Sequence, residues 1–189
     1  MKKTEIVLAS GSPRRIEYLK QLGVDFLTVI PDIEEKLNPK LPIEKAVVEI
    51  AKDKAYAVSK CKQNTMVMAF DTVVVLDGVV LGKPKNSEEA VKMLAKLSGQ
   101  THRVITGCAI VQENSIETFH SQAEVTFNRL SCDEIKSYVD SNNVLDKAGA
   151  YAIQGEAAKF VVKTNGDYHA IIGFPLNRIY KFLQSKSYL

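Results

Sequence analysis

The chain has 189 residues, an apolar fraction of 46% and a formal net charge of +3, the balance of 25 basic and 22 acidic residues. A chain of this length is expected to form one domain over residues 1–189, which can comprise two lobes and which buries a core without disulfides or metals. The charges are well mixed, and the densest positive run, Lys52–Lys62, is interrupted by Asp53 and apolar residues. No basic stripe is wide enough to follow a nucleic-acid backbone, so nucleic acid is not an expected partner.

The cysteines and the N-terminus indicate a protein of the cytoplasm. Cys61, Cys108 and Cys132 are widely spaced and lack the C-x-x-C pair of a zinc or redox site, so we interpret them as reduced thiols. The apolar run Ile6–Ala9 is too short for a signal peptide, and no stretch approaches the ~20 apolar residues of a membrane span. We therefore expect a cytoplasmic protein without a membrane partner.

The first half of the chain alternates predicted strands and helices. Glu5–Ser10 is rich in Ile, Val and Leu and predicts a buried strand. Pro13–Leu22 predicts a helix that Ser12 caps and Gly23 ends. The next predicted elements are a short strand at Phe26–Ile30, a helix from Pro42 to Ser59, a strand at Thr65–Leu76 and, after the turn Asp77-Gly78, a strand at Val79–Leu81.

The second half adds further helices and two long strands. Ser87 is the expected cap of a helix that ends before Gly99. The remaining predicted elements are strands at Arg103–Gln112 and Ile116–Asn128, a helix at Cys132–Asp140, short strands at Tyr151–Ile153 and Phe160–Lys163, and a helix from Pro175 to Leu183. Strands and helices that alternate early, followed by a late hairpin, predict an α/β fold with a mixed sheet.

The segment Ser10–Arg15 places a glycine turn between a strand and a helix N-terminus. Free backbone N–H groups at a helix start attract anions. Arg14 and Arg15 oppose the helix dipole by ~0.3–1 kcal/mol each unless an anion is bound, and the guanidinium group suits phosphate oxygens. The pattern alone fits a phosphate site and a plain helix cap with two solvated arginines equally well.

Asp71 interrupts the apolar strand Thr65–Leu76 and is followed by Thr72. Burying an ionised carboxylate costs several kcal/mol unless it is paired or bound to a metal. A polar residue inside a core strand therefore indicates a site. The alternative is an aspartate at the mouth of the strand that is bonded to a nearby helix.

Lys54 lies near the middle of the apolar stripe of the helix Pro42–Ser59, whereas Lys45 and Lys52 fall on its far side. An inward lysine can extend along the apolar surface until its charge reaches the edge. The alternative is that it points into a cleft, where it meets phosphate. The sequence leaves both interpretations open.

Two loops and the histidines carry weaker signals. The loop Gly82-Lys83-Pro84 lets a backbone approach a ligand, although by itself it fits an ordinary loop. Glu34 and Glu35 can hold Mg²⁺ through carboxylate oxygens or can simply be solvated. The histidines lack metal-ligand spacing and are interpreted as structural or surface residues; they are His102, His120 and His169.

Taken together and in this order, the segments resemble the Maf family of nucleoside triphosphate pyrophosphatases. The resemblance spans nearly the whole chain. Its motifs are LASGSPRR at Leu8–Arg15, DTVV at Asp71–Val74, GKP at Gly82–Pro84, LSGQTH at Leu97–His102, DKAGAYAIQG at Asp146–Gly155 and YHAIIGFPL at Tyr168–Leu176. The AYxIQG pattern resembles the subfamily acting on dTTP and UTP rather than the one acting on 7-methyl-GTP.

The resemblance implies an elongated Maf/ITPase-like α/β fold with a mixed twisted sheet, two lobes and a central cleft, often as a homodimer. It also implies a cytoplasmic house-cleaning hydrolase that uses a divalent metal, Mg²⁺ or Mn²⁺. The residue roles it implies are Asp71 as proton acceptor, Ser10, Arg14, Arg15, Lys54 and Lys83 as phosphate-binding residues, Glu35 and Asp71 at the metal, and Arg14, Thr72 and Gln154 as selectors of the substrate.

In the implied reaction, Asp71 deprotonates the attacking water while metal and cations neutralise the polyphosphate, and attack at the α-phosphorus expels pyrophosphate. The Gln154 amide offers a donor and an acceptor that match O4 and N3–H of uracil or thymine, although this pair can also match other bases. Two alternatives stay open. One is the same chemistry with a different base preference, and the other is a nucleotide-sensing regulator of cell division without turnover.

Overall fold

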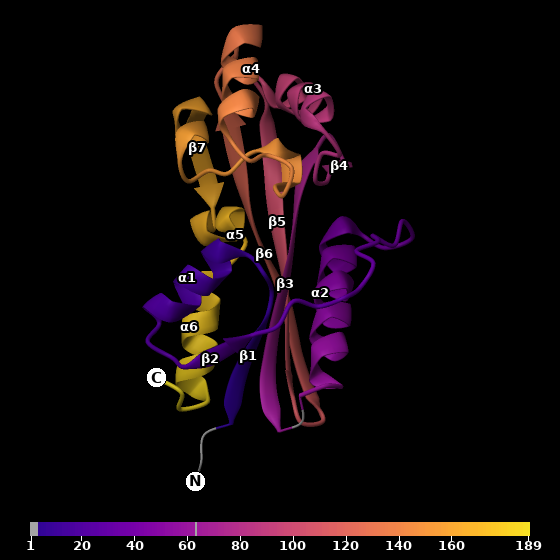
Figure 1. Ribbon diagram of the computed structural model, residues 1–189, viewed down its shortest axis with the longest axis vertical. Helices are drawn as coiled ribbons and strands as arrows, with labels where there is room; N and C mark the ends of the chain where they lie inside the picture. The colour runs from indigo at the N-terminus through magenta and orange to yellow at the C-terminus, as the bar shows by residue number, and fades with distance from the viewer. Residues whose placement is uncertain (1–3, 63) are drawn as a thin grey trace. The chain divides into compact units, whose positions relative to one another are not determined.

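The chain folds into two compact units. The first comprises the residues up to Asp71 together with Thr106–Ser121 and Gly173–Leu189, and the second comprises Thr72–Ile105 and Gln122–Ile172. This computed structural model describes residues 4–62 and 64–189. Figure 1 labels its helices and strands.

The three longest strands each contribute to both units. They are β3 (Thr65–Leu76), β5 (Thr101–Gln112) and β6 (Ser115–Phe127). The others are β1 (Glu5–Ala9), β2 (Phe26–Thr28), β4 (Val79–Leu81) and β7 (Val161–Gly166). Within the described residues they form a seven-stranded sheet in the order β2-β1-β3-β5-β6-β7, with β4 beside β3. β1 is parallel to β2 and β3, whereas β4 and β7 are antiparallel to their neighbours, so the predicted α/β fold with a mixed sheet is confirmed.

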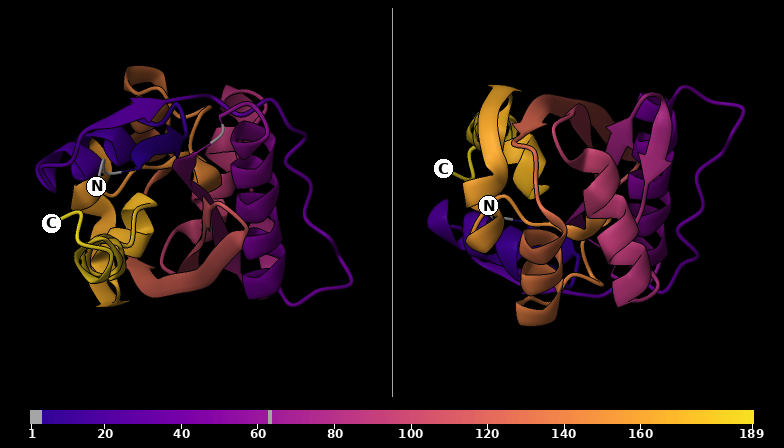
Figure 2. Two further views of the ribbon diagram at one scale, coloured as in Figure 1. Left: turned by 90° about the horizontal axis from the view of Figure 1, so that it is seen from below. Right: turned by 90° about the horizontal axis from the view of Figure 1, so that it is seen from above.

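Helices cover both faces of the sheet in the first unit. Figures 1 and 2 show α2 (Ile43–Ser59) on one face and α1 (Pro13–Gln21) and α6 (Leu176–Ser185) on the other. The alternation of side chains along a strand explains this arrangement. Ile6 and Leu8 of β1 pack in the cluster that contains α1 and α6, and Val7 and Ala9 pack in the cluster that contains α2.

The helix α2 approaches β5 closely because Gly107 has no side chain. A Cβ atom at Gly107 would lie 2.7 Å from the carbonyl carbon and oxygen of Val47 and 2.8 Å from the nitrogen of Val48. The buried face of α2 consists of Ala46, Val47, Ile50, Ala51, Lys54, Ala55 and Val58. The helix therefore carries the charged Lys54 on the same face that packs against the sheet.

Helices and a cluster of aromatic side chains accompany the strands of the second unit. Its helical elements are α3 (Ser87–Leu97), α4 (Cys132–Ser141), α5 (Tyr168–Ile172) and the 3₁₀ turns η1 (Ala148–Ala150) and η2 (Glu156–Phe160). Phe160 lies edge-on to Phe127 and Tyr138, at ring-centroid distances of 6.1 and 5.3 Å. No helix in the described ranges is long and apolar enough to cross a membrane.

The predicted strand at Tyr151–Ile153 is wrong. Gly149 and Ala150 have φ angles of 66° and 63°, so the chain turns just before Tyr151. Tyr151 and Ile153 are buried, but the segment belongs to no strand. The apolar alternation at these positions reflects packing of an irregular segment rather than sheet pairing.

The helix caps also differ from the prediction. The cap of α3 is Asn86, not Ser87, because the Asn86 side chain accepts a hydrogen bond from the Glu89 N–H at 2.9 Å. Ser12 precedes α1 as predicted but makes no side-chain cap bond. Its own N–H donates to Ser10 Oγ at 3.2 Å.

Candidate functional site

Lys54 joins two carboxylates in the first unit. Its Nζ donates to Asp71 Oδ1 at 2.7 Å and lies 2.9 Å from Glu35 Oε1. Lys54 and Asp71 are only 5% and 6% exposed, whereas the Glu35 side chain, in the loop before α2, is 40% exposed. The lysine therefore does not extend to the helix edge, and it ends between the two carboxylates.

The Asp71 carboxyl is held in an environment that favours proton uptake. Burial raises its pKa above the ordinary value, and the charge and hydrogen bond of Lys54 oppose this rise, followed by the charge of Arg15. A carboxylate with a raised pKa is a better proton acceptor than a solvated one. Asp71 is thus a candidate general base, paired with a cation that keeps it ionisable.

Arg15 is bound mainly by the protein itself. Its Nε donates to the Gly173 carbonyl at 2.9 Å, and its Nη1 donates to Ser10 Oγ at 3.2 Å and to the Phe70 carbonyl at 3.1 Å. Its guanidinium carbon lies 5.6 Å from the centroid of the Phe70 ring. Burial lowers the pKa of Arg15, and the charge of Asp71 opposes that shift. Arg15 therefore ties the start of α1 to the residue before Asp71.

Arg14 differs from its neighbour. It is half-buried, and its side chain forms no hydrogen bond or ion pair with any other residue of the ranges 4–62 and 64–189. It stands in the first turn of α1, where the first backbone N–H groups have no partner within the helix. Of the two arginines, Arg14 is the one whose donors are available to an anion.

Thr72, Lys83 and Gln154 belong to the second unit, where their segments meet at Gly149. The Gly149 N–H donates to the Gly82 carbonyl at 3.0 Å. A Cβ atom at Gly149 would lie 2.9 Å from a methyl group of Val74. The segments that begin at Thr72, Gly82 and Gly149 are therefore packed together, while Lys83 and Gln154 are exposed and Thr72 is half-buried.

The predicted residues thus fall into two sets, one in each unit. The set of the first unit is Ser10, Arg14, Arg15, Glu35, Lys54 and Asp71. The set of the second unit is Thr72, Lys83 and Gln154. Sequence reasoning missed the backbone carbonyls of Phe70 and Gly173 that hold Arg15, since no side-chain signal marks a carbonyl.

The two carboxylates at Lys54 suit a divalent cation in part. Glu35 and Asp71 already place one oxygen each on a single ammonium group, so the point between them is favourable for positive charge. Mg²⁺ is commonly held by one or two carboxylates together with substrate phosphates. The described residues contain no group of three or more His, Cys, Asp or Glu side chains that could hold a metal. Glu35 and Asp71 therefore fit a metal that substrate oxygens help to bind.

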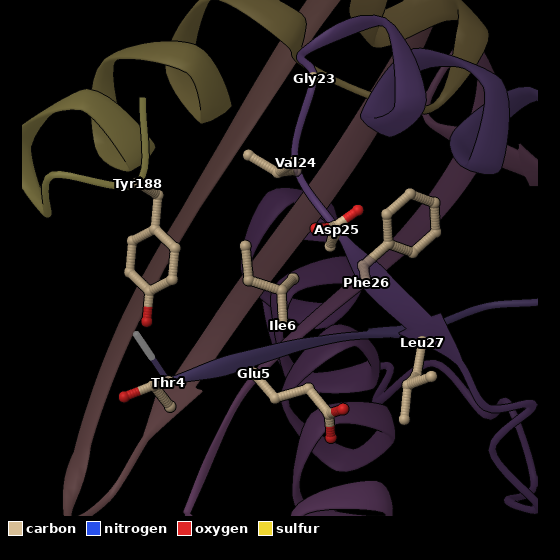
Figure 3. A pocket seen from close by; sticks show the side chains of 9 residues that line it. All are labelled: Thr4, Glu5, Ile6, Gly23, Val24, Asp25, Phe26, Leu27 and Tyr188. Atoms are coloured by element: carbon tan, nitrogen blue, oxygen red, sulfur yellow. The ribbon is translucent and has the colours of Figure 1, made fainter. Parts of the chain in front are cut away.

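A separate pocket opens at the other end of β1. Its cavity of about 380 Å³ is lined by Thr4, Glu5, Ile6, Gly23, Val24, Asp25, Phe26, Leu27 and Tyr188 (Figure 3). All of these residues except Tyr188, which follows α6, precede or begin β1 and β2, whereas Ser10 follows the end of β1. None of the predicted site residues lines this pocket.

These features describe an α/β protein in which the first turn of α1 carries two arginines and Asp71 forms a buried pair with Lys54. The chain belongs to the Maf family, because the family model described as Maf-like protein matches residues 5–186. The family resemblance drawn from the motifs is thereby confirmed.

Similar proteins agree with this assignment. The dTTP/UTP pyrophosphatase of Shigella sonnei is 46% identical over 183 residues, which cover 96% of this chain and 93% of the relative. The protein of the same name from Escherichia coli K12 is 45% identical with the same coverage.

Among solved structures, the Ham1 protein of Staphylococcus aureus has a TM-score of 0.55 at 19% identity, covering 96% of this chain and 99% of its own. A HAM1 protein from Coxiella burnetii has a TM-score of 0.52 at 16% identity, covering 97% and 100%. These structures share the fold.

Proposed function

We propose that this protein is a nucleoside triphosphate pyrophosphatase that hydrolyses dTTP and UTP to the monophosphate and pyrophosphate. The observation that carries the proposal is the buried pair of Lys54 and Asp71, 2.7 Å apart, in a chain whose relatives are named dTTP/UTP pyrophosphatase. A buried base paired with a cation is expensive to maintain and is typical of a catalytic site.

Asp71 acts as the general base. It accepts a proton from water, the water oxygen bonds to the α-phosphorus, and the bond from that phosphorus to the bridging oxygen of the β-phosphate breaks. Pyrophosphate leaves with the bonding electron pair. The raised pKa of Asp71 favours the proton transfer, and Lys54 keeps the carboxylate ionised until water is in place.

Phosphate binding falls to cationic side chains and to backbone N–H groups. Arg14 and the N-terminal turn of α1 bind phosphate oxygens, and Lys83 provides a further cation. Ser10 and Arg15 shape this turn, because the Ser10 hydroxyl accepts from both Ser12 N–H and Arg15 Nη1. We retain Ser10 and Arg15 as phosphate-site residues, with contacts to the protein as their main contribution.

Glu35 and Asp71 would hold the divalent metal, Mg²⁺ or Mn²⁺, together with oxygens of the triphosphate. Such an ion supplies charge neutralisation for the polyphosphate. Lys54 would keep both carboxylates oriented toward one point before substrate arrives. Assembly as a homodimer in the cytoplasm belongs to the same proposal and rests on the family resemblance.

Base selection is assigned to Gln154, Thr72 and Arg14. The Gln154 amide can donate to O4 and accept from N3–H of uracil or thymine, and cytosine presents the opposite pattern at these positions. An amide turned by 180° would match cytosine instead, so this selection requires the protein to hold the Gln154 amide in one orientation, which leaves the polar groups unpaired with the wrong base. Pyrimidine triphosphates with a 4-oxo group are therefore the expected substrates.

A pyrophosphate-release assay over a panel of triphosphates tests the proposal. We expect dTTP and UTP to be hydrolysed in preference to ATP, dCTP and 7-methyl-GTP, and we expect chelation of divalent metal to stop the reaction. Asp71→Asn should lower kcat at least about 100-fold, the usual contribution of a general base, while nucleotide binding persists. A preference for another base would refute the dTTP/UTP assignment but would agree with the proposed pyrophosphatase reaction. Nucleotide binding without turnover by the wild type would favour a sensor instead.

A further inference from the structure

The second unit contains a buried histidine–tyrosine pair. His102, at the start of β5, and Tyr151 are 1% and 6% exposed, and His102 Nε2 lies 2.8 Å from the Tyr151 hydroxyl. Phe127 packs edge-on against both rings, with centroid distances of 5.0 Å to His102 and 4.8 Å to Tyr151. One hydrogen bond inside an aromatic cluster thus joins the two side chains.

Packing alone does not account for a histidine here. Its Nδ1 has no hydrogen-bond partner in the described part of the chain. Burial lowers the pKa of His102 to about 4, so the ring is neutral at physiological pH. An unpaired buried nitrogen is unfavourable, and an apolar ring at this position would avoid that cost. The polar pair provides a directional hydrogen bond, which fixes the position of the Tyr151 ring relative to β5.

Tyr151 begins the short segment that leads to Gln154. The backbone is fixed on both sides of it, since Gly149 N–H donates to the Gly82 carbonyl at 3.0 Å and Ala152 N–H donates to the Tyr138 hydroxyl at 3.4 Å. The left-handed turn just before Tyr151 gives the segment a defined direction. The His102–Tyr151 bond then ties this turn to β5, and Gln154 follows at the surface.

We propose that His102 and Tyr151 are positioning residues that hold the Gln154 amide in register with the base and so set the discrimination between bases. This rests on the proposed function, in which Gln154 reads O4 and N3–H. Hydrogen bonds weaken steeply when the donor–hydrogen–acceptor angle departs from linearity. A small displacement of the segment would therefore weaken the bonds between Gln154 and the base. The chemical step at Asp71 depends on residues of the first unit and would change less.

Steady-state kinetics of three variants with dTTP and dCTP test this role. Tyr151→Phe keeps the ring and removes the hydroxyl, His102→Leu removes the ring nitrogens, and His102→Gln keeps a polar group near the position of Nε2. We expect Tyr151→Phe and His102→Leu to raise the KM for dTTP about tenfold with little change in kcat, and to lower the dTTP-to-dCTP ratio of kcat/KM by a similar factor. His102→Gln should keep most of the wild-type ratio.

Thr101→Val is the matched control. Thr101 precedes His102 on β5, and its exposed hydroxyl bonds to that of Thr126 at 2.8 Å, away from Tyr151. This variant should keep the wild-type ratio. If Tyr151→Phe and His102→Leu also keep it, the positioning role is wrong, even if their thermal stability falls. If His102→Leu does not fold, Tyr151→Phe decides, because its ring contacts remain.

The wild type separates this inference from the proposed function. A wild type that hydrolyses no triphosphate refutes the function itself. A wild type that hydrolyses dTTP and dCTP equally leaves no discrimination to position, and it overturns the inference while the pyrophosphatase activity stands.

Discussion

At the residue scale, Lys54 is a buried cation whose charge is balanced by two carboxylates. It is almost fully buried and lies within 3 Å of an oxygen of each of two carboxylates. Removing one partner of a buried ion pair leaves the other without compensation, which commonly destabilises a protein by about 3–5 kcal/mol. Asp71 can avoid part of that cost by taking up a proton, and it then no longer serves as a base.

Lys54→Met should therefore lower kcat at least about 100-fold while the protein still folds. Loss of the lysine removes the largest influence that opposes the burial-induced rise in the pKa of Asp71, so more of this residue is protonated at neutral pH. Lys52→Met is the control on the same helix, because Lys52 is partly exposed and pairs with Glu49 at 2.9 Å. Equal losses in both variants, measured by pyrophosphate release and thermal unfolding, would show that Lys54 has no specific role.

Replacement by lysine should affect protein stability at Arg15 and substrate binding at Arg14. Lysine cannot reproduce the three bonds of Arg15 to Gly173, Ser10 and Phe70, so Arg15→Lys should reduce the free energy of unfolding by about 2–3 kcal/mol. Arg14→Lys should leave the stability within about 0.5 kcal/mol and raise KM for the triphosphate. Urea unfolding and steady-state kinetics measure both quantities. A stable Arg15→Lys with raised KM would instead make Arg15 a direct phosphate ligand.

At the element scale, the contact between α2 and β5 depends on one missing side chain. Gly107→Ala would place a methyl group 2.7 Å from backbone atoms of Val47, and a helix backbone cannot rotate away as a flexible side chain can. We expect a loss of stability of about 1–3 kcal/mol, typical of an overpacked core, and lower activity because α2 carries Lys54. Gly82→Ala is the stability control, since nothing lies within 4 Å of its Cβ position. Equal melting temperatures for the two variants would contradict this packing argument.

The sequence predicts helices and strands best where the apolar pattern extends over many residues. The stripe of α2 and the run of β3 are long enough to be unambiguous, and β3 has the predicted bounds Thr65–Leu76. The irregular segment at Tyr151–Ile153 carries the same apolar alternation as a strand, and the left-handed Ala150 that redirects it has no residue-type signal. The short helix α5 escaped prediction because five residues offer too little periodicity.

At the scale of the whole molecule, some features of the candidate site can be recognised in the sequence, and others are visible only in the folded chain. Asp71 and Lys54 are polar residues in apolar surroundings, so each stands out in the sequence, and they are indeed partners. The bond from Arg15 to the Gly173 carbonyl joins residues 158 positions apart, and that between His102 and Tyr151 spans 49. Such pairings follow from chain topology, which a single sequence does not display.

The path of the chain has a genetic consequence. After Ile172 the chain returns to the first unit, and this last stretch supplies the carbonyl that anchors Arg15, the Phe174 ring 5.0 Å from that of Phe70, and α6. No residue assigned to catalysis lies there. A premature stop codon at Gly173 would nevertheless remove α6 from the sheet face that it covers with α1, and it would remove the carbonyl that accepts from Arg15 Nε. A nonsense mutation at this position should therefore destabilise the first unit, although every residue assigned to catalysis is still synthesised.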